Sequence, residues 1–247
     1  MASPRILVIQ PDELDPPARL ADWLTGAGAE LDVVRPGKNE LPEPTAYRGV
    51  VCLGGAMGAN DDPDHPWLAD VRRLLAAAVT ARVPTLAICL GAQLLAVATG
   101  GRVEVGDAGP EVGPGLVAKR DAAWKDPLFA DLPFMPDVLQ FHDDAIVRLP
   151  HGAELLAAGT QYPNQAFRIG PSAYGVQFHI ETTPEIVLEW ARLSPESAAT
   201  ARSGEFEPAR VRAHHADLEE TWRPFTERFV RLAGGELAPV TSTLPMA

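Results

Sequence analysis

The stretch TLAICLGAQLLA, residues 85–96, decides how this chain folds and where its chemistry lies. An apolar run ends at Cys89, a glycine follows two residues later, and a second apolar run starts at once. A buried strand that turns sharply into a helix has this pattern, because only small residues fit a crowded turn. Cys89 at the corner is either a small buried hydrophobe, as free cysteines often are, or a nucleophile presented on the turn.

The segments around this corner alternate between strand and helix. Continuous apolar strands linked by helices indicate a parallel sheet covered on both faces. Ligands of such sheets bind outside the carboxyl ends of the strands, the edge where Gly54, Gly55 and Cys89 are expected to lie. The periodicity predicts strands at 5–10, 30–36, 47–55 and 84–89, and helices at 16–29, 65–83 and 90–101.

The second half of the chain has a different pattern. Short strand-like segments separated by turn residues predict a mixed or antiparallel extension of the same sheet. A helix is expected at 183–193, with Pro184 in its first turn. One or two amphipathic helices are expected at 206–235, followed by a loose terminus. We therefore divide the chain into a domain of residues 1–193 and a helical extension of residues 194–247 packed on it.

Charge and composition exclude several classes of partner. The 247 residues carry 21 Lys and Arg against 33 Asp and Glu, a formal charge of −12. Nucleic acids and anionic membranes need basic patches, so neither is an expected partner. No apolar run reaches the ~18 residues of a membrane span, and the N-terminus lacks signal-peptide features. Two cysteines and no Cys/His cluster predict no disulfide framework and no metal, and favour a reducing cytoplasm.

A cysteine nucleophile needs a base, and the base needs an orienting group. Strand alternation over QFHIE, residues 177–181, would place His179 and Glu181 on one face. A carboxylate there can fix the histidine tautomer and stabilise the imidazolium. An ordinary surface histidine has the same local pattern, so the pair alone leaves both interpretations open. Cys52 lies inside an apolar strand and is predicted to be structural.

Three separated segments together resemble the class I (triad) glutamine amidotransferase family. They are GGAMG (54–58), PTLAICLGAQLLAVATGG (84–101) and YGVQFHIE (174–181), in the order of the family. The resemblance covers roughly residues 48–190 and points to the stand-alone branch similar to the glutaminase domain of GMP synthase. It implies a flavodoxin-like three-layer α/β sandwich, with a mostly parallel central sheet, an antiparallel extension and a helical C-terminal tail.

The resemblance also implies roles for individual residues. Cys89 matches the nucleophile that attacks a γ-carboxamide carbon to give a γ-glutamyl thioester. His179 matches the base that activates the thiol and then protonates the leaving amine, and Glu181 matches the carboxylate that orients it. The other matched positions bind substrate: the backbone N–H groups of Gly55 and Leu90, which form the oxyanion hole, and the side chain of Gln93.

The segment QFHDD, residues 140–144, aligns with a family loop that usually has the sequence S-H-G-D and holds the α-amino and α-carboxyl groups of the substrate. The resemblance thus implies substrate contacts for His142 and Asp143. Asp143 stands where the family has glycine and adds a negative charge. That change argues against plain glutamine, and a carboxylate here would suit a cationic amine in the leaving-group pocket.

Three functional hypotheses follow. The favoured one is a free-standing thiol amidohydrolase that cleaves the γ-amide of a γ-glutamyl amine or peptide, a small-molecule substrate, without metal or organic cofactor. The alternative is a glutaminase subunit that hydrolyses glutamine and passes ammonia to a separate synthetase partner. A non-catalytic binding or regulatory protein on the same fold would have a broken triad, whereas all three triad positions are filled here.

Overall fold

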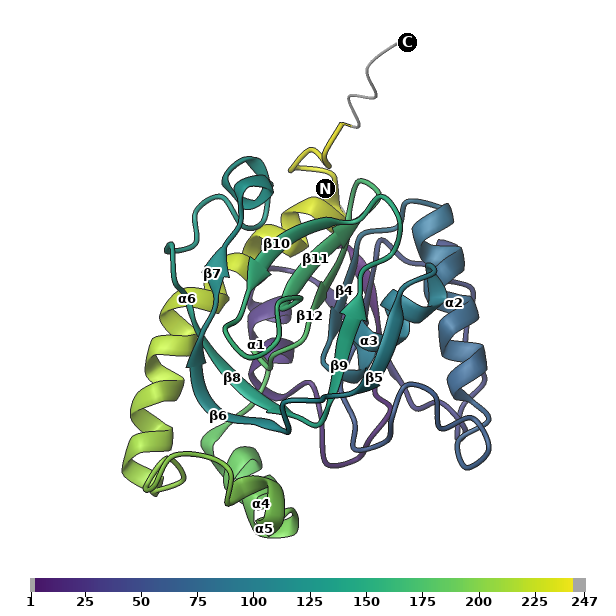
Figure 1. Cartoon of the computed structure of the whole chain (residues 1–247). Coiled ribbons are helices and arrows are strands. Elements are labelled where there is room, and N and C mark those ends of the chain that lie inside the picture. Colours follow the sequence, from purple (N-terminus) through teal and green to yellow (C-terminus); the bar gives the residue numbers. More distant parts are fainter. Residues whose placement is uncertain (1–2, 242–247) are drawn as a thin grey trace.

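A central eight-stranded sheet organises the computed structural model, which describes residues 3–241 (Figure 1). Its first five strands run parallel, and the last three continue it antiparallel. The predicted mostly parallel sheet with an antiparallel extension is confirmed. In spatial order the strands are β2 (Glu30–Val34), β1 (Arg5–Ile9), β3 (Gly49–Cys52), β4 (Thr85–Ile88), β12 (Ala173–Val176), β11 (Ala166–Ile169), β10 (Glu154–Ala158) and β7 (Ala118–Lys119).

Helices cover both faces of this sheet because its parallel strands are apolar on both sides. Along β1, Ile6 and Val8 join one core cluster while Leu7 and Ile9 join the other, as the alternation of strand side chains requires. The first cluster includes side chains of α1 (Ala18–Gly26) and α6 (Pro208–Gly234), and the second those of α2 (Leu68–Thr80) and α3 (Leu90–Ala98). The result is the expected three-layer sandwich.

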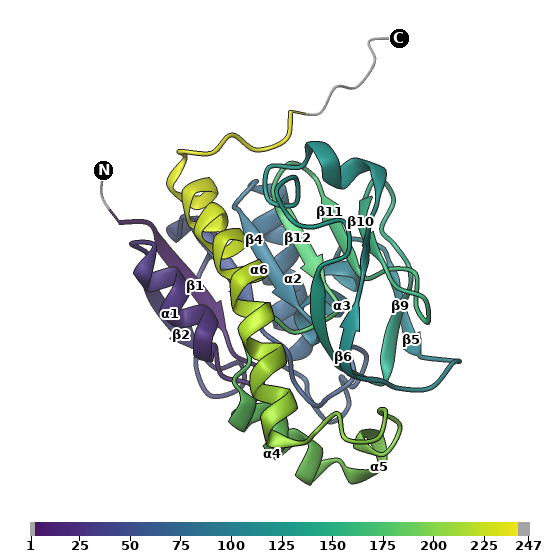
Figure 2. The same ribbon diagram turned by 90° about the vertical axis from the view of Figure 1, so that its left-hand side faces the viewer.

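The range 206–235, predicted to hold one or two helices, forms a single long helix. Helix α6 runs beside α1 across one face of the molecule (Figure 2). Its Trp222 is fully buried and donates a hydrogen bond from Nε1 to the carbonyl oxygen of Asp137, at 2.8 Å. The boundary at residue 193 stays a prediction. Of the predicted loose terminus, Val240 donates its N–H to the carbonyl of Pro171 at 3.1 Å, and residues 242–247 lie outside the described part.

Two short antiparallel ribbons and a helical segment lie at the edge of the sheet where the parallel strands end. The ribbons are β5 (Arg102–Val105) with β9 (Asp144–Arg148), and β6 (Glu111–Leu116) with β8 (Asp137–His142). Helix α4 (Pro184–Leu193) begins as predicted, with Thr183 accepting the Ile186 N–H at its N-terminus, and α5 (Pro195–Ala198) follows it. The 3₁₀ turns are η1 (Pro44–Ala46) and η2 (Asp121–Lys125). These elements bring residue 143 towards the strand ends.

Several predicted elements are longer than the observed ones. Strand β3 ends at Cys52 and β4 at Ile88, so the glycine pair and Cys89 lie just beyond the sheet. The helix predicted at 65–83 spans only Leu68–Thr80, because Pro66 precedes the helix instead of occupying its first turn. Loops next to strands and helices have no periodic pattern of their own, so the sequence predicted these strands and this helix to be longer than they are. Within residues 3–241, no helix combines the length and the apolar character needed to cross a membrane.

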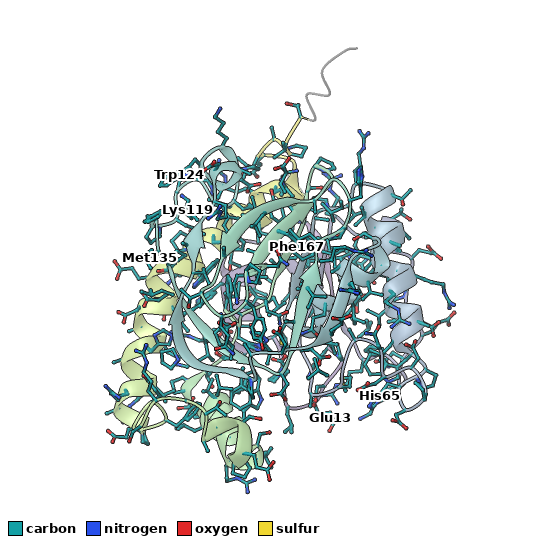
Figure 3. All side chains as sticks on the ribbon, in the orientation of Figure 1. Glu13, His65, Lys119, Trp124, Met135 and Phe167 are labelled. Carbon is teal, nitrogen blue, oxygen red and sulfur yellow. The ribbon has the colours of Figure 1, made fainter. Side chains whose placement is uncertain are left out.

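The outer edge of the antiparallel extension carries a charge. Lys119 on the two-residue edge strand β7 holds its ammonium 4.0 Å from the centre of the Trp124 ring (Figure 3). The same ammonium donates hydrogen bonds to the carbonyl oxygens of Ala130 and Leu132, at 2.8 and 2.9 Å. A short edge strand with a lysine is unsuited to pairing with another chain.

Gly91 allows the first turn of α3 to approach the backbone of β3. A Cβ atom at Gly91 would overlap the carbonyl oxygen of Cys52 and lie 2.8 Å from its carbonyl carbon. Backbone cannot move as a flexible side chain can, so Gly91→Ala is expected to lower the free energy of unfolding by about 1–3 kcal/mol. Urea denaturation measures this. Gly26→Ala is the matched control, since nothing lies within 4 Å of its Cβ position. Equal stability of the two variants would contradict the prediction.

Candidate active site

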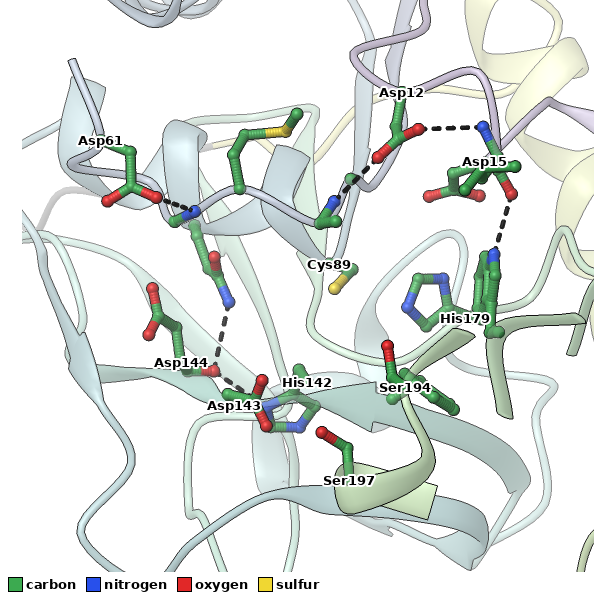
Figure 4. A pocket seen from close by; sticks show the side chains of 18 of the residues that line it. Asp12, Asp15, Asp61, Cys89, His142, Asp143, Asp144, His179, Ser194 and Ser197 are labelled. Carbon is green, nitrogen blue, oxygen red and sulfur yellow. Dashed lines mark hydrogen bonds between the residues drawn. The ribbon is translucent and has the colours of Figure 1, made fainter. Parts of the chain in front are cut away.

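The loops that follow the parallel strands enclose a cavity of about 530 Å³ (Figure 4). It lies where parallel sheets bind their ligands, outside the carboxyl ends of the strands. Its walls come from the loops after β1 and β3, the corner after β4, the end of β5, the turn between β8 and β9, and α4 with the segments on either side of it. Among the residues that line it are Asp15, Gly55, Cys89, Gln93, Asp143 and His179.

Cys89 occupies a sharp corner between β4 and α3, as the opening stretch predicted. Its φ of +50° and ψ of −110° are unusual for a residue with a side chain, and such backbone strain persists only where the surroundings impose it. Its N–H donates to the carbonyl of Val176 at 2.8 Å, and its own carbonyl accepts the N–H of Gln93 at 3.0 Å. Cys89 lines the cavity at the N-terminus of α3, where unpaired N–H groups lie at the positive end of the helix dipole.

His179 and Glu181 form a buried hydrogen-bonded pair. Nδ1 of His179 lies 2.5 Å from Oε1 of Glu181, whose other oxygen accepts the N–H of Ile180 at 2.8 Å. The predicted reason for this contact was wrong. Strand β12 ends at Val176, and residues 177–181 form a bend that His179 fixes by donating its N–H to the carbonyl of Leu139 at 2.8 Å. The bend, rather than strand alternation, turns the two side chains towards each other.

The electrostatics of this pair suit a histidine that carries a proton. Burial lowers the pKa of His179, but the charge of Glu181 and the neighbouring Cys89 outweigh burial and hold this pKa well above its usual value. Burial raises the pKa of Glu181, yet the charge and hydrogen bond of His179 keep it below the usual range. Glu181 is therefore ionised. Burial also raises the pKa of the Cys52 thiol, which stays protonated as expected of a structural cysteine.

Two further side chains, one beside His179 and one beside Cys89, were not predicted. Trp190 packs its ring against that of His179, with centroids 4.8 Å apart at 62°, and donates Nε1–H to the carbonyl of Leu14 at 2.8 Å. Gln177 places Nε2 3.8 Å from Sγ of Cys89. Trp190 lies on a predicted helix with nothing in the sequence to mark it. Gln177 lies inside the quoted YGVQFHIE motif, which was the available signal.

The residues predicted to bind substrate are divided between the cavity and its surroundings. Gly55 and Gln93 line the cavity, and Nε2 of Gln93 donates to the carbonyl of Asp144 at 3.2 Å. Leu90 is buried as the first residue of α3, so only its backbone N–H is available to a ligand. Asp143 is exposed at the turn between β8 and β9 and lines the cavity.

His142 lines the cavity, and its predicted contact with substrate stays a prediction. Its ring is buried, with Nδ1 2.8 Å from the carbonyl oxygen of Asp144 and Nε2 3.1 Å from Oε2 of Glu111. Both ring nitrogens are therefore engaged within the protein. The contacts indicate that His142 holds the turn that carries Asp143 and Asp144.

The cavity is strongly acidic. Burial raises the pKa of Asp144, and the nearby charges of Asp61 and Asp143 raise it further. Such mutual repulsion among carboxylates is relieved by a bound positive charge. Among residues 3–241, no lysine or arginine lines this cavity. Its acidic lining consists of Asp12, Asp15, Asp61, Glu104, Asp143 and Asp144.

One group of side chains has the spacing of a metal site. Donor atoms of Asp15, His179 and Glu181 all lie within 4.8 Å of one another. Nδ1 of His179 and Oε1 of Glu181 are already bonded to each other, so this pair is satisfied without a cation. The arrangement instead matches a base and its orienting carboxylate beside a thiol.

A family model described as glutamine amidotransferase class-I matches residues 19–187. The chain therefore belongs to the class-I glutamine amidotransferase family, and the resemblance drawn from the three motifs is confirmed. Membership places it among the cysteine amidohydrolases and amidotransferases as a class.

Individual relatives show how far the likeness extends. The chain is 32% identical over 146 residues to GMP synthase [glutamine-hydrolyzing] of Christiangramia forsetii, a match that covers 58% of this chain and 26% of that protein. It thus spans about a quarter of the GMP synthases it matches. It is 28% identical over 167 residues to Gamma-glutamyl peptidase 4 of Arabidopsis thaliana, covering 66% of each.

Solved structures share the fold of this protein over nearly the whole chain. A glutamine amidotransferase from Thermotoga maritima superposes with a TM-score of 0.80 at 28% identity, covering 93% of this chain and 99% of that one. A glutamine amido transferase from Methylobacillus flagellatus gives a TM-score of 0.79 at 25% identity, covering 99% of this chain and all of the other.

Proposed function

We propose that this chain is a free-standing thiol amidohydrolase that cleaves the γ-amide of a γ-glutamyl amine or peptide and releases glutamate and an amine. One observation carries the proposal: the buried His179–Glu181 pair stands beside Cys89, which is held on a strained corner that opens into the cavity. Nucleophile, base and orienting carboxylate are the parts that acyl transfer needs.

The thiol proton of Cys89 passes to Nε2 of His179, because Nδ1 is held by Glu181. This transfer gives the protonated His179 that its raised pKa favours. The thiolate attacks the γ-carbonyl carbon, and the oxygen of that carbonyl becomes an anion. Backbone N–H groups of Leu90, in the first turn of α3, and of Gly55 are suited to stabilise this oxyanion. The imidazolium of His179 then gives its proton to the leaving amine, the C–N bond breaks, and a γ-glutamyl thioester remains.

In the deacylation step His179 acts as a base again. It removes a proton from water, whose oxygen attacks the thioester carbon, and it returns the proton to the sulfur of Cys89 as the C–S bond breaks. Glutamate leaves and the thiol is restored. Throughout both steps the negative charge of Glu181 stabilises the imidazolium, which is formed away from bulk water.

The acidic cavity supports a leaving amine that carries a positive charge. Asp143 and Asp144 lie at its rim and wall, and a cationic group nearby would reduce the repulsion that raises the pKa of Asp144. Similarity to Gamma-glutamyl peptidase 4 supports a hydrolase acting on γ-glutamyl compounds. Similarity to the GMP synthases supports the alternative, a glutaminase subunit that passes ammonia to a synthetase partner.

A substrate panel tests the proposal. It contains glutamine, a γ-glutamyl diamine with a free ammonium group, a γ-glutamyl alkylamine of equal length and γ-glutamylglycine. We expect the diamine adduct to have the highest kcat/KM, about 3–10-fold above the alkylamine, since one charge pair at a partly exposed site contributes about 1 kcal/mol. Asp143→Asn is expected to reduce this preference, and added salt to weaken it.

The control for the panel is Asp22→Asn, which removes an exposed carboxylate on α1, away from the cavity. A preference for γ-glutamylglycine would contradict the cationic leaving group. Hydrolysis of glutamine only after a synthetase is added would favour the glutaminase subunit. No hydrolysis of any compound would favour a binding protein.

A further inference from the structure

Asp15 is a buried carboxyl group that the proposed mechanism does not use. It lies on the loop after β1, is 3% exposed, and lines the cavity on the same side as Cys89 and His179 (Figure 4). Neither of its carboxyl oxygens has a hydrogen-bond partner among residues 3–241. An unpartnered buried carboxylate is costly, so its presence beside the reacting groups requires an explanation.

The space for this carboxyl is made by a glycine. A Cβ atom at Gly54 would overlap Oδ2 of Asp15, and it would lie 3.1 Å from Cε1 of His179 and 3.4 Å from Cβ of Cys89. Gly54 therefore marks the point where the loop after β3 meets the carboxyl, the base and the nucleophile. One carboxyl oxygen of Asp15 also lies within 4.8 Å of one donor atom of His179 and one of Glu181.

The surroundings of Asp15 decide its protonation state. Burial raises its pKa, and the charge of Glu181 and then that of Asp12 raise it further, against the opposing effect of His179. The thiol of Cys52 is another titratable group close enough to be affected by its charge. An ionised Asp15 would face another carboxylate with no donor to satisfy it. A protonated Asp15 has one O–H to donate, and Glu181 is the acceptor within reach.

We propose that Asp15 is a positioning residue for the catalytic pair: as a neutral carboxylic acid it donates its O–H to the carboxylate of Glu181 and holds that carboxylate against Nδ1 of His179. This inference rests on the proposed roles of Cys89, His179 and Glu181. A hydrogen bond between a neutral acid and a carboxylate is strong, and inside the protein it is not weakened by water. Glu181 would then be fixed from both sides, by Asp15 and by the N–H of Ile180.

A matched pair of variants tests the donor. Asp15→Asn keeps the shape and supplies an amide N–H, whereas Asp15→Val fills the same space with no donor. We expect Asp15→Asn to keep kcat within about threefold of the parent protein. Asp15→Val is expected to lower kcat by about 10–100-fold with little change in KM, the size of effect seen when a supporting hydrogen bond of a site is removed. Asp22→Asn serves as the control for loss of charge.

A second measurement keeps this test independent of the substrate. The rate at which iodoacetamide alkylates Cys89 at neutral pH reports how readily the thiol gives its proton to His179. It is expected to fall in Asp15→Val and to be kept in Asp15→Asn. If the parent protein hydrolyses none of the panel, the proposed function fails while the alkylation rates still test Asp15. Thermal unfolding shows whether each variant is folded. If Asp15→Val does not fold, Asp15→Ala takes its place as the variant without a donor.

Two outcomes would overturn the inference. Equal kcat and equal alkylation rates in Asp15→Asn and Asp15→Val would show that the donor has no role. A raised KM in both variants, with kcat unchanged, would assign Asp15 to the substrate as an ionised carboxylate.

Discussion

Replacement of Cys89 by alanine is expected to lower kcat/KM for every γ-glutamyl substrate by about 10⁴-fold or more. Loss of the nucleophile removes the covalent route, and what remains is binding and the oxyanion hole. Cys52, the second cysteine of the chain, cannot substitute for it, because it is fully buried in β3 and burial raises the pKa of its thiol. Initial-rate kinetics on the best substrate of the panel measures the loss.

Cys52→Ala is the matched control for this result. It removes a thiol of the same kind from the neighbouring strand and is expected to keep kcat/KM within about threefold, with a modest loss of stability from the small cavity it leaves. Intact-mass measurement of acid-quenched protein should detect a γ-glutamyl adduct in the parent and in Cys52→Ala, and none in Cys89→Ala. Full activity of Cys89→Ala would refute the thioester mechanism.

Glu181→Gln is expected to lower kcat by about 10²–10⁴-fold and to move the alkaline limb of the pH–rate profile to lower pH. The charge of Glu181 raises the pKa of His179, while burial alone lowers it. Removal of the charge therefore lowers that pKa, and His179 loses its proton at a lower pH. The variant then lacks the acid that protonates the leaving amine. Glutamine also permits the wrong histidine tautomer, which accounts for the size of the loss in kcat.

The measurement is kcat/KM from pH 5 to pH 10 for the parent and the variant. Glu227→Gln on α6 is the control, since it makes the same substitution at an exposed carboxylate that, within residues 3–241, is paired with Arg223 alone. An alkaline limb that stays in place in Glu181→Gln would show that Glu181 does not set the pKa of His179. Thermal unfolding curves of the variant and the parent protein show whether the variant is folded, so that a loss of kcat is not mistaken for a loss of folding.

Much of the fold could be predicted because its signals are local. The apolar runs of β1, β3 and β4 follow one another at the spacing of strand–helix–strand units, and such units permit a parallel sheet. The corner at Cys89 is likewise encoded within a few residues. The ends of the strands were predicted less accurately. Gly54, Cys89 and His179 lie just beyond strands, in segments without a regular hydrogen-bonding pattern that would mark the boundary.

The sequence by itself determined the family, the strand–helix order, the corner that joins Cys89 to its helix, and the motif that carries His179 and Glu181. Only the tertiary structure brought these together: β12 pairs with β4 in parallel, with Val176 opposite Ile88, and this register sets His179 beside a cysteine ninety residues earlier. It also decided that Asp15 lies against the pair. Contacts between loops depend on which strands are neighbours in the sheet, and the order of strands is not encoded in the local periodicity of the sequence.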